Sequence, residues 1–149
     1  METESYNREV IIAWQVLEYI KQSEPEDFSY LNVDWLARKY KVTPSYLSKA
    51  FKKEFDFLLG DFIKRVRIMH GARLLVKKKK LSIRKISEIL DFGDSNSFIR
   101  AFKEVYGITP ETYRVIAVIV PKIQRQTRKY RLEKEKRIKE KTEKTTAPA

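Results

Sequence analysis

The chain has 149 residues and a formal net charge of +12, and it contains no cysteine. This length allows one domain, or one domain with a tail, and the lack of thiols excludes disulfides, thiol chemistry and cysteine-based zinc sites. No apolar run approaches the roughly 18 residues that cross a bilayer, and the acidic N-terminus is not followed by the apolar segment of a secretory signal, so we expect a cytoplasmic protein.

The charge is unevenly distributed along the chain. Residues 1–27 carry two basic and seven acidic side chains, a net charge of −5. Residues 28–115 carry 19 basic and nine acidic side chains (+10), and residues 116–149 carry 11 basic and four acidic side chains (+7). A basic centre and a basic tail behind an acidic leader suggest a polyanionic partner.

The first predicted element is an amphipathic helix over residues 8–22. Its apolar residues recur at helical spacing: Ile11, Trp14, Val16, Leu17 and Ile20. Pro25 lies just beyond and cannot continue the hydrogen-bond ladder of a helix. Residues 1–27 are therefore predicted to be an acidic leader with one helix.

A helix, a short turn and a second helix are predicted within residues 28–60. Asn32 is a good N-cap for a helix over residues 33–40, with Val33, Leu36 and Ala37 facing inward. Thr43 as N-cap and Pro44 as first helical residue begin the next helix, which runs to about Glu54. The residues that this second helix is expected to bury are Leu47, Ala50 and Phe51. Two short helices joined by a turn are typical of a DNA-reading unit.

A linker helix is predicted within residues 61–80. Asp61 is the expected N-cap of a helix over residues 62–76, and the lysines at 77–80 close its C-terminus, where cations favour the helix dipole. The apolar residues expected to pack against the neighbouring units are Phe62, Val66, Met69, Leu74 and Leu75.

Residues 81–116 are predicted to repeat the first unit, with Phe98–Lys103 matching Leu47–Lys52. Ser82 caps a helix over residues 83–90, and Asp94 caps a helix that ends near Tyr106 and is followed by Gly107. The side chains that these two helices are expected to bury are Ile83, Ile86, Ile89, Phe98, Phe102 and Val105. Pro110 opens a short final helix that ends near Ile116. Residues 117–149 are predicted to be a basic tail, a frayed helix or disordered, because Pro121 interrupts the pattern.

The region from about Leu17 to Arg114 resembles the DNA-binding domain of the AraC/XylS family of bacterial transcription regulators. The most specific residues of the match are Phe92, Phe98, Arg100, Phe102, Lys103, Gly107, Pro110, Tyr113 and Arg114. The resemblance implies an all-α fold of two helix-turn-helix subdomains, homeodomain-like units joined by a linker helix. It also implies a bacterial, nucleoid-associated transcription regulator, for example an activator.

Several positions depart from the family pattern. Where the family usually has glycine in the two turns, this chain has Asp56 and Asp91. Aspartate tolerates the left-handed backbone conformation better than most residues, so we expect the turns to survive. Gly71 and Ser87 stand where alanine is usual, and both are small enough to keep close helix packing.

The expected DNA contacts lie opposite the buried faces of the two second helices. They are Ser45, Ser48, Lys49 and Lys52 in the first unit and Ser95, Asn96, Arg100 and Lys103 in the second. Asparagine pairs bidentately with adenine and arginine with guanine, whereas lysines near helix C-termini suit phosphates. The predicted function is sequence-specific reading of double-stranded DNA through two successive major-groove turns, by a monomer or weak dimer.

Two alternatives remain open: an architectural DNA-binding protein with little sequence preference, and a protein-interaction module that docks on RNA polymerase. No enzyme is expected, because the chain lacks a glycine-rich phosphate loop and has a single histidine, His70. No catalytic residue, cofactor or metal is therefore predicted. Only about 30 residues precede the first unit, so the resemblance implies no small-molecule effector domain here. We expect a stand-alone member or the C-terminal part of a longer regulator.

Overall fold

The structure is a computed structural model, and it describes residues 2–146. In these residues the chain forms helices joined by short turns, and no strand is present. The elements are α1 (Glu2–Gln22), η1 (Pro25–Asp27), α2 (Val33–Lys39), α3 (Pro44–Phe55), α4 (Leu59–Lys77), α5 (Ile83–Ile89), α6 (Ser95–Tyr106) and α7 (Pro110–Thr146). The predicted all-α fold of two helix-turn-helix subdomains joined by a linker helix is confirmed. Within residues 2–146 no helix is both long and apolar enough to cross a membrane.

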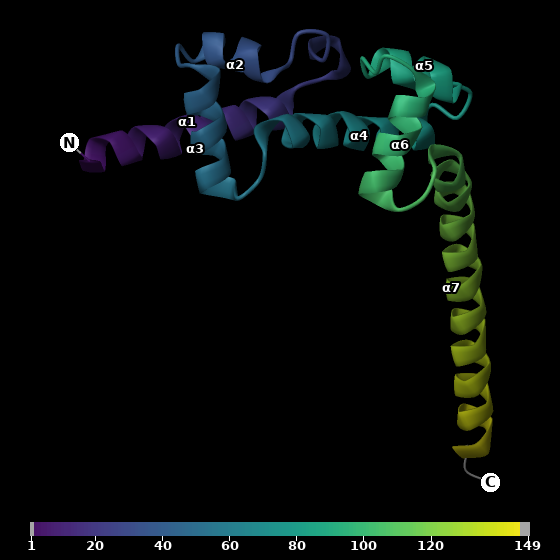
Figure 1. Cartoon of the computed structure of the whole chain (residues 1–149). Helices are drawn as coiled ribbons and strands as arrows, with labels where there is room; N and C mark the ends of the chain where they lie inside the picture. Colours follow the sequence, from purple (N-terminus) through teal and green to yellow (C-terminus); the bar gives the residue numbers. More distant parts are fainter. Residues whose placement is uncertain (1, 147–149) are drawn as a thin grey trace.

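The two subdomains lie at opposite ends of α4 (Figure 1). At one end, α1, α2 and α3 pack together; at the other, α5 and α6 pack with the first turns of α7. Both α3 and α6 run across the direction of α4, and α7 continues far beyond the packed body. The linker helix therefore fixes how far apart the two subdomains stand.

Four of the five predicted caps begin helices in the structure. The side chains of Asn32, Thr43, Ser82 and Asp94 each accept a hydrogen bond from a backbone N–H three residues ahead. Each bond satisfies one of the donors that the first turn of a helix leaves without a partner. The prediction for Asp61 is wrong, because α4 begins at Leu59 with Leu58 as its N-cap. Asp61 lies instead in the first turn, where a carboxylate still favours the helix dipole.

Residues in the left-handed backbone conformation close the turns between the helices. Asp56 (φ 52°) and Asp91 (φ 57°) adopt the conformation that the sequence predicted for them, and Gly107 (φ 74°) ends α6. Lys41 (φ 55°) adopts the same left-handed conformation in the turn between α2 and α3, which was not predicted from the sequence. The turns thus keep their shape with aspartate or lysine in a conformation that costs side-chain-bearing residues roughly 1–2 kcal/mol.

One hydrophobic core runs through both subdomains. Most of the predicted inward residues of α3 and α6 are buried, with Leu47, Phe51, Phe98 and Phe102 fully covered. Val105 was also predicted to be buried but is only half-buried. Met69 was expected in this core but is 47% exposed, because it lies on the outer side of α4.

Gly71 marks the closest approach between α4 and the second subdomain. A Cβ at this position would lie 2.9 Å from both Leu90 Cδ1 and Phe98 Cε2. The buried Ser87 is likewise small. The predicted close packing at these two positions is therefore present.

Two predicted helix ends are wrong. The first helix begins at Glu2, earlier than Arg8, and the last helix does not end near Ile116 but continues to Thr146. Pro121 lies inside α7, and the helix continues through it although proline has no backbone N–H to donate. The residues after it are mostly lysine, arginine, glutamate and glutamine, which are good helix formers. The segment predicted to be frayed or disordered is therefore helical as far as the structure describes it.

Candidate nucleic-acid interface

The helix α3 presents a polar face to solvent. Leu47, Ala50 and Phe51 hold its inner side in the core. On the other side Ser45, Lys49 and Lys52 are exposed, and Ser48 is half-buried. The structure therefore brings the four residues predicted in the first subdomain onto one helix with accessible side chains.

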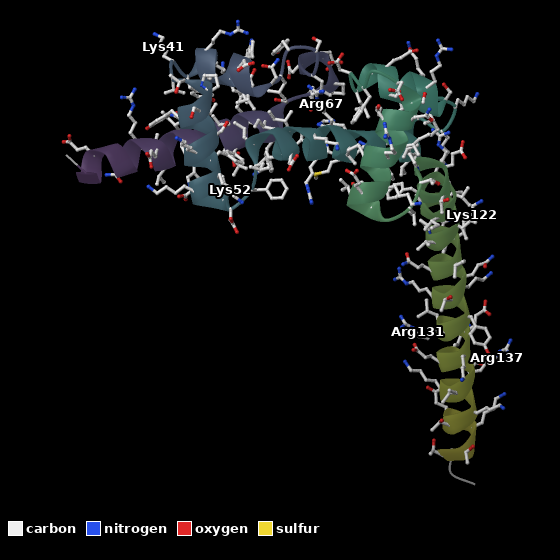
Figure 2. All side chains as sticks on the ribbon, viewed as in Figure 1. Lys41, Lys52, Arg67, Lys122, Arg131 and Arg137 are labelled. Carbon is white, nitrogen blue, oxygen red and sulfur yellow. The ribbon has the colours of Figure 1, made fainter. Side chains whose placement is uncertain are left out.

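Lys52 also closes the C-terminal end of α3. Figure 2 labels Lys52 on α3. Its Nζ lies 3.0 Å from Asp56 Oδ1 and donates a hydrogen bond to the Asp56 carbonyl oxygen at 3.2 Å. The Asp56 side chain is almost fully exposed, and exposed ion pairs contribute little to stability. A phosphate can thus replace this carboxylate as the partner of Lys52 at low energetic cost.

The helix α1 supports α3 from outside the helix-turn-helix. Trp14 Nε1 donates to Glu54 Oε1 at 2.9 Å, and its ring meets Phe55 edge-on at 5.1 Å between centroids. Lys53 Nζ lies 2.9 Å from Glu9 Oε2. The position of Trp14 on the apolar stripe of the first helix predicted that it packs, but the sequence did not indicate that it packs against α3. These contacts fix the orientation of α3.

The helix α6 presents the second polar face. Phe98 and Phe102 are fully buried, and the Phe102 ring stacks on Tyr106 at 4.6 Å between centroids. The residues predicted to contact DNA lie away from this core: Asn96, Arg100 and Lys103 are exposed and Ser95 is half-buried. The second predicted set is therefore also displayed on one helix.

Asp94 is the N-cap of α6, and its carboxyl group is ionised. Its two carboxylate oxygens accept hydrogen bonds from the backbone N–H and the hydroxyl of Ser97, at 2.8 Å and 2.7 Å. These bonds to Ser97 lower the pKa of the Asp94 carboxyl, and the cation of Arg100 lowers it further. The capping carboxylate thus steadies the N-terminal turn of α6, which carries Ser95 and Asn96.

His70, the single histidine of the sequence, is a core residue. It is 6% exposed, and its ring packs edge-on against Phe28 at 5.2 Å between centroids. Burial, and to a lesser degree Arg73, lower the pKa of the imidazole. Among the described residues no group of three or more histidine, aspartate or glutamate side chains is arranged to hold a metal ion.

The geometry of the two faces defines the class of protein. The 19 residues of α4 span ~28 Å at about 1.5 Å per residue, close to the roughly 34 Å between successive major-groove turns on one side of DNA. Two exposed helices rich in Ser, Asn, Lys and Arg stand at the ends of that linker. Together they form a double helix-turn-helix DNA-binding domain.

Comparison with known proteins identifies the family. A family model described as a helix-turn-helix domain matches residues 36–115, more than half of the chain. The Msm operon regulatory protein of Streptococcus mutans is 37% identical over 86 residues, which are 58% of this chain and 31% of that protein. The F1 operon positive regulatory protein of Yersinia pestis is 32% identical over 101 residues, 68% of this chain and 33% of that protein. This chain thus spans about a third of the length of either relative.

A solved structure shares the fold. The C-terminal domain of AraT, a response regulator from Geobacillus stearothermophilus, is 28% identical with a TM-score of 0.61. The similarity covers 69% of this chain and 83% of that domain. The chain belongs to the AraC/XylS family of transcription regulators and contains its DNA-binding domain.

Proposed function

We propose that this chain is a sequence-specific transcription regulator that inserts α3 and α6 into successive major-groove turns of DNA. The observation that carries the proposal is the pair of exposed polar faces on α3 and α6, joined by one helix of matching length. In this proposal residues 28–60 and 81–116 are the two reading units, residues 61–80 link them, and residues 117–149 form a basic tail.

The side chains differ in what they can read. Arg100 is exposed in the middle of α6, and its guanidinium suits the O6 and N7 atoms of guanine. Asn96, one turn earlier, suits adenine. Ser45, Ser48 and Ser95 are short and permissive donors or acceptors near the beginning or middle of their helices. We assign base contacts to these five residues.

The lysines are proposed to position the protein on the DNA and not to read its sequence. Lys49, Lys52 and Lys103 are exposed, and the last two lie in the last turns of α3 and α6. A lysine is a point charge that suits phosphate oxygens, and such contacts position a protein on DNA without reading a base. If α4 holds the two helices slightly closer than one groove turn, DNA must bend, and the bending cost adds sequence preference.

The experiment that tests this proposal is a selection of bound duplexes from a random 30-base-pair pool at near-physiological salt. The expected result is enrichment of two short elements about 10–11 base pairs apart. An Arg100→Ala variant in parallel should lose enrichment in one element only. Retention of DNA with no enriched sequence would contradict the proposal and favour an architectural DNA-binding protein.

A second part of the proposal concerns regulation. One relative is named a positive regulatory protein, and we propose that this chain also activates transcription, on the bacterial nucleoid and with RNA polymerase as its partner. Purified RNA polymerase and a template carrying the selected site should give more transcript when the chain is added. Equal or reduced transcript would contradict activation while leaving DNA reading intact.

A further inference from the structure

A hollow of about 320 Å³ lies where α4, α6 and α7 meet (Figure 1). Ala72 and Val76 of α4 give it an apolar lining, together with the side chain of Met69. Tyr106, the last residue of α6, and Tyr113, near the start of α7, line it from the other two helices. The volume is at the lower end of the roughly 300–1,000 Å³ that is usual for sites of small organic molecules. None of the eight residues predicted to contact DNA lines this hollow.

The ring of Tyr106 has a counterpart in the first subdomain. In α6 the ring centroids of Phe102 and Tyr106 are 4.6 Å apart, and in α3 those of Phe51 and Phe55 are 4.8 Å apart. The helix α1 covers Phe55 with an aromatic ring, since the indole of Trp14 meets it edge-on at 5.1 Å between centroids. Over Tyr106 the helix α4 provides aliphatic side chains and a thioether but no ring. The hollow therefore leaves space for a ring at the place that corresponds to Trp14.

Two cations line the same hollow. Arg73 and Lys77 are exposed and lie one turn apart on α4. Neither side chain makes a hydrogen bond or an ion pair within residues 2–146, and no carboxylate lines the hollow. Burial raises the pKa of the Tyr106 phenol, and Tyr113 raises it further, whereas the Arg73 cation lowers it. The positive charge of Arg73 thus acts at the phenol of Tyr106, inside the hollow.

These features select one class of ligand. An apolar lining of aliphatic groups, a thioether and two phenol rings suits a flat aromatic body, because rings pack offset or edge-on and sulfur packs against ring edges. A guanidinium group beside an ammonium group suits a carboxylate, which the guanidinium can bind through two parallel hydrogen bonds. We propose that the hollow binds an aromatic carboxylate, with its ring against Tyr106 and Tyr113 and its carboxylate on Arg73 and Lys77.

A ligand in this place would link the second subdomain to the linker helix. Tyr106 ends α6, so a molecule held between this residue and α4 would bias the orientation of α6 relative to α4. An effect on DNA reading would rest on the proposed function. The binding itself does not, and the test below measures it without DNA, so that the two can fail separately.

The test is a titration of the full chain, isotope-labelled at its methionine methyl groups and followed by NMR. The sequence has two methionines, so Met69 reports on the hollow and Met1 serves as the internal reference. Cinnamate should shift the Met69 signal in a saturable way, with a Kd of roughly 1–5 mM, the affinity that a ligand of its size reaches at ordinary efficiency. Cinnamyl alcohol, its uncharged counterpart, should bind about tenfold more weakly, because it cannot make charge-assisted hydrogen bonds.

Variants locate the carboxylate. Arg73→Gln/Lys77→Gln removes both cations at exposed positions, and it should weaken cinnamate about tenfold and leave cinnamyl alcohol unchanged. The matched control is Arg128→Gln/Arg131→Gln, which changes the net charge equally beside a different hollow on α7 and should keep the affinity for cinnamate. Val76→Trp fills the apolar lining and should abolish binding of both compounds.

The inference would be overturned by a Met69 signal that does not respond to cinnamate, or by equal affinities of the wild type for cinnamate and cinnamyl alcohol. Equal losses in the two glutamine variants would also overturn it, because the net charge of the chain alone would then explain the binding. Inorganic phosphate at the concentration of cinnamate should not displace it. Displacement would assign Arg73 and Lys77 to phosphate and contradict a carboxylate site.

Discussion

Arg67 and Arg114 make the same contact in the two halves of the molecule. Arg67 Nη2 donates to the carbonyl oxygen of Leu31 at 2.9 Å, and Arg114 Nη2 donates to that of Leu81 at 2.7 Å. Leu31 and Leu81 each immediately precede the N-cap of the first helix in a helix-turn-helix. Each arginine belongs to the helix that follows its unit, α4 or α7, so each unit is closed by the helix behind it.

The first prediction concerns the stability of this closure. Arg67, which is labelled in Figure 2, also donates to the Phe28 carbonyl oxygen at 2.7 Å. Burial lowers the pKa of its guanidinium. Arg67→Met keeps much of the volume but leaves two carbonyl oxygens without that donor. We expect the free energy of unfolding in urea to fall by about 2 kcal/mol. Lys64→Met is the control, since it breaks only the exposed pair with Glu104 and should cost under about 1 kcal/mol. Equal losses in the two variants would contradict this role.

The second prediction concerns helix packing at Gly71. Gly71→Ala adds a methyl group 2.9 Å from Leu90 Cδ1 and Phe98 Cε2. The strain of overpacking, about 1–3 kcal/mol, exceeds the roughly 1 kcal/mol that alanine gains over glycine inside a helix. We expect a net loss of about 1 kcal/mol in the free energy of unfolding. Gly60→Ala, which meets no atom within 4 Å, should be neutral or stabilising in the same urea titration. A Gly71→Ala protein as stable as the wild type would show that the helices can separate without cost.

Local signals allowed the sequence to predict much of this fold. Side-chain caps act within three residues, so Asn32, Thr43, Ser82 and Asp94 could be recognised from the chain alone. The buried faces of α3 and α6 followed from helical periodicity. Because those faces fix which side remains accessible, the sequence also predicted which residues α3 and α6 display.

Interactions between distant segments were not predictable in this way. Trp14 and Glu54 are 40 residues apart, and Arg67 bonds to carbonyl groups that every residue carries. Neither contact leaves a pattern in the sequence. The predicted end of the last helix near Ile116 was wrong for a different reason. Pro121 was given more weight than the helix-forming residues that follow it. Whether Arg100 and Asn96 read bases stays a prediction.

The third prediction is a pH dependence that comes from His70. Burial holds the pKa of this imidazole below the ordinary 6.5, with Arg73 acting in the same direction and Glu24 and Glu26 opposing. Well above pH 6.5 neither the folded nor the unfolded state binds the proton, and the histidine adds no pH dependence. Between 6.5 and the lower folded-state value only the unfolded state is protonated, so the free energy of unfolding falls as the pH falls.

Urea unfolding between pH 7.5 and 5.5 measures this effect. The wild type should lose up to about 1.4 kcal/mol per pH unit more than His70→Gln, which cannot take up a proton. The carboxylates of the two proteins affect the free energy of unfolding equally, so their contribution cancels when the two pH curves are subtracted. Parallel curves for the two proteins would mean that His70 is as easily protonated in the folded state as in the unfolded one.

The fourth prediction separates base reading from phosphate binding on α6. Arg100→Ala should weaken binding to the selected duplex by about 1–3 kcal/mol, or roughly 5- to 150-fold, and should make one base pair of the site indifferent to sequence. Lys103→Ala, an exposed cation one turn later, should weaken binding to all duplexes alike and reduce the salt dependence by about one counterion. Fluorescence anisotropy with the selected duplex, its single-base variants and a salt series distinguishes the two. If Arg100→Ala behaves like Lys103→Ala, Arg100 binds a phosphate, and the sequence preference of the second unit must come from Asn96, Ser95 or the shape of the DNA.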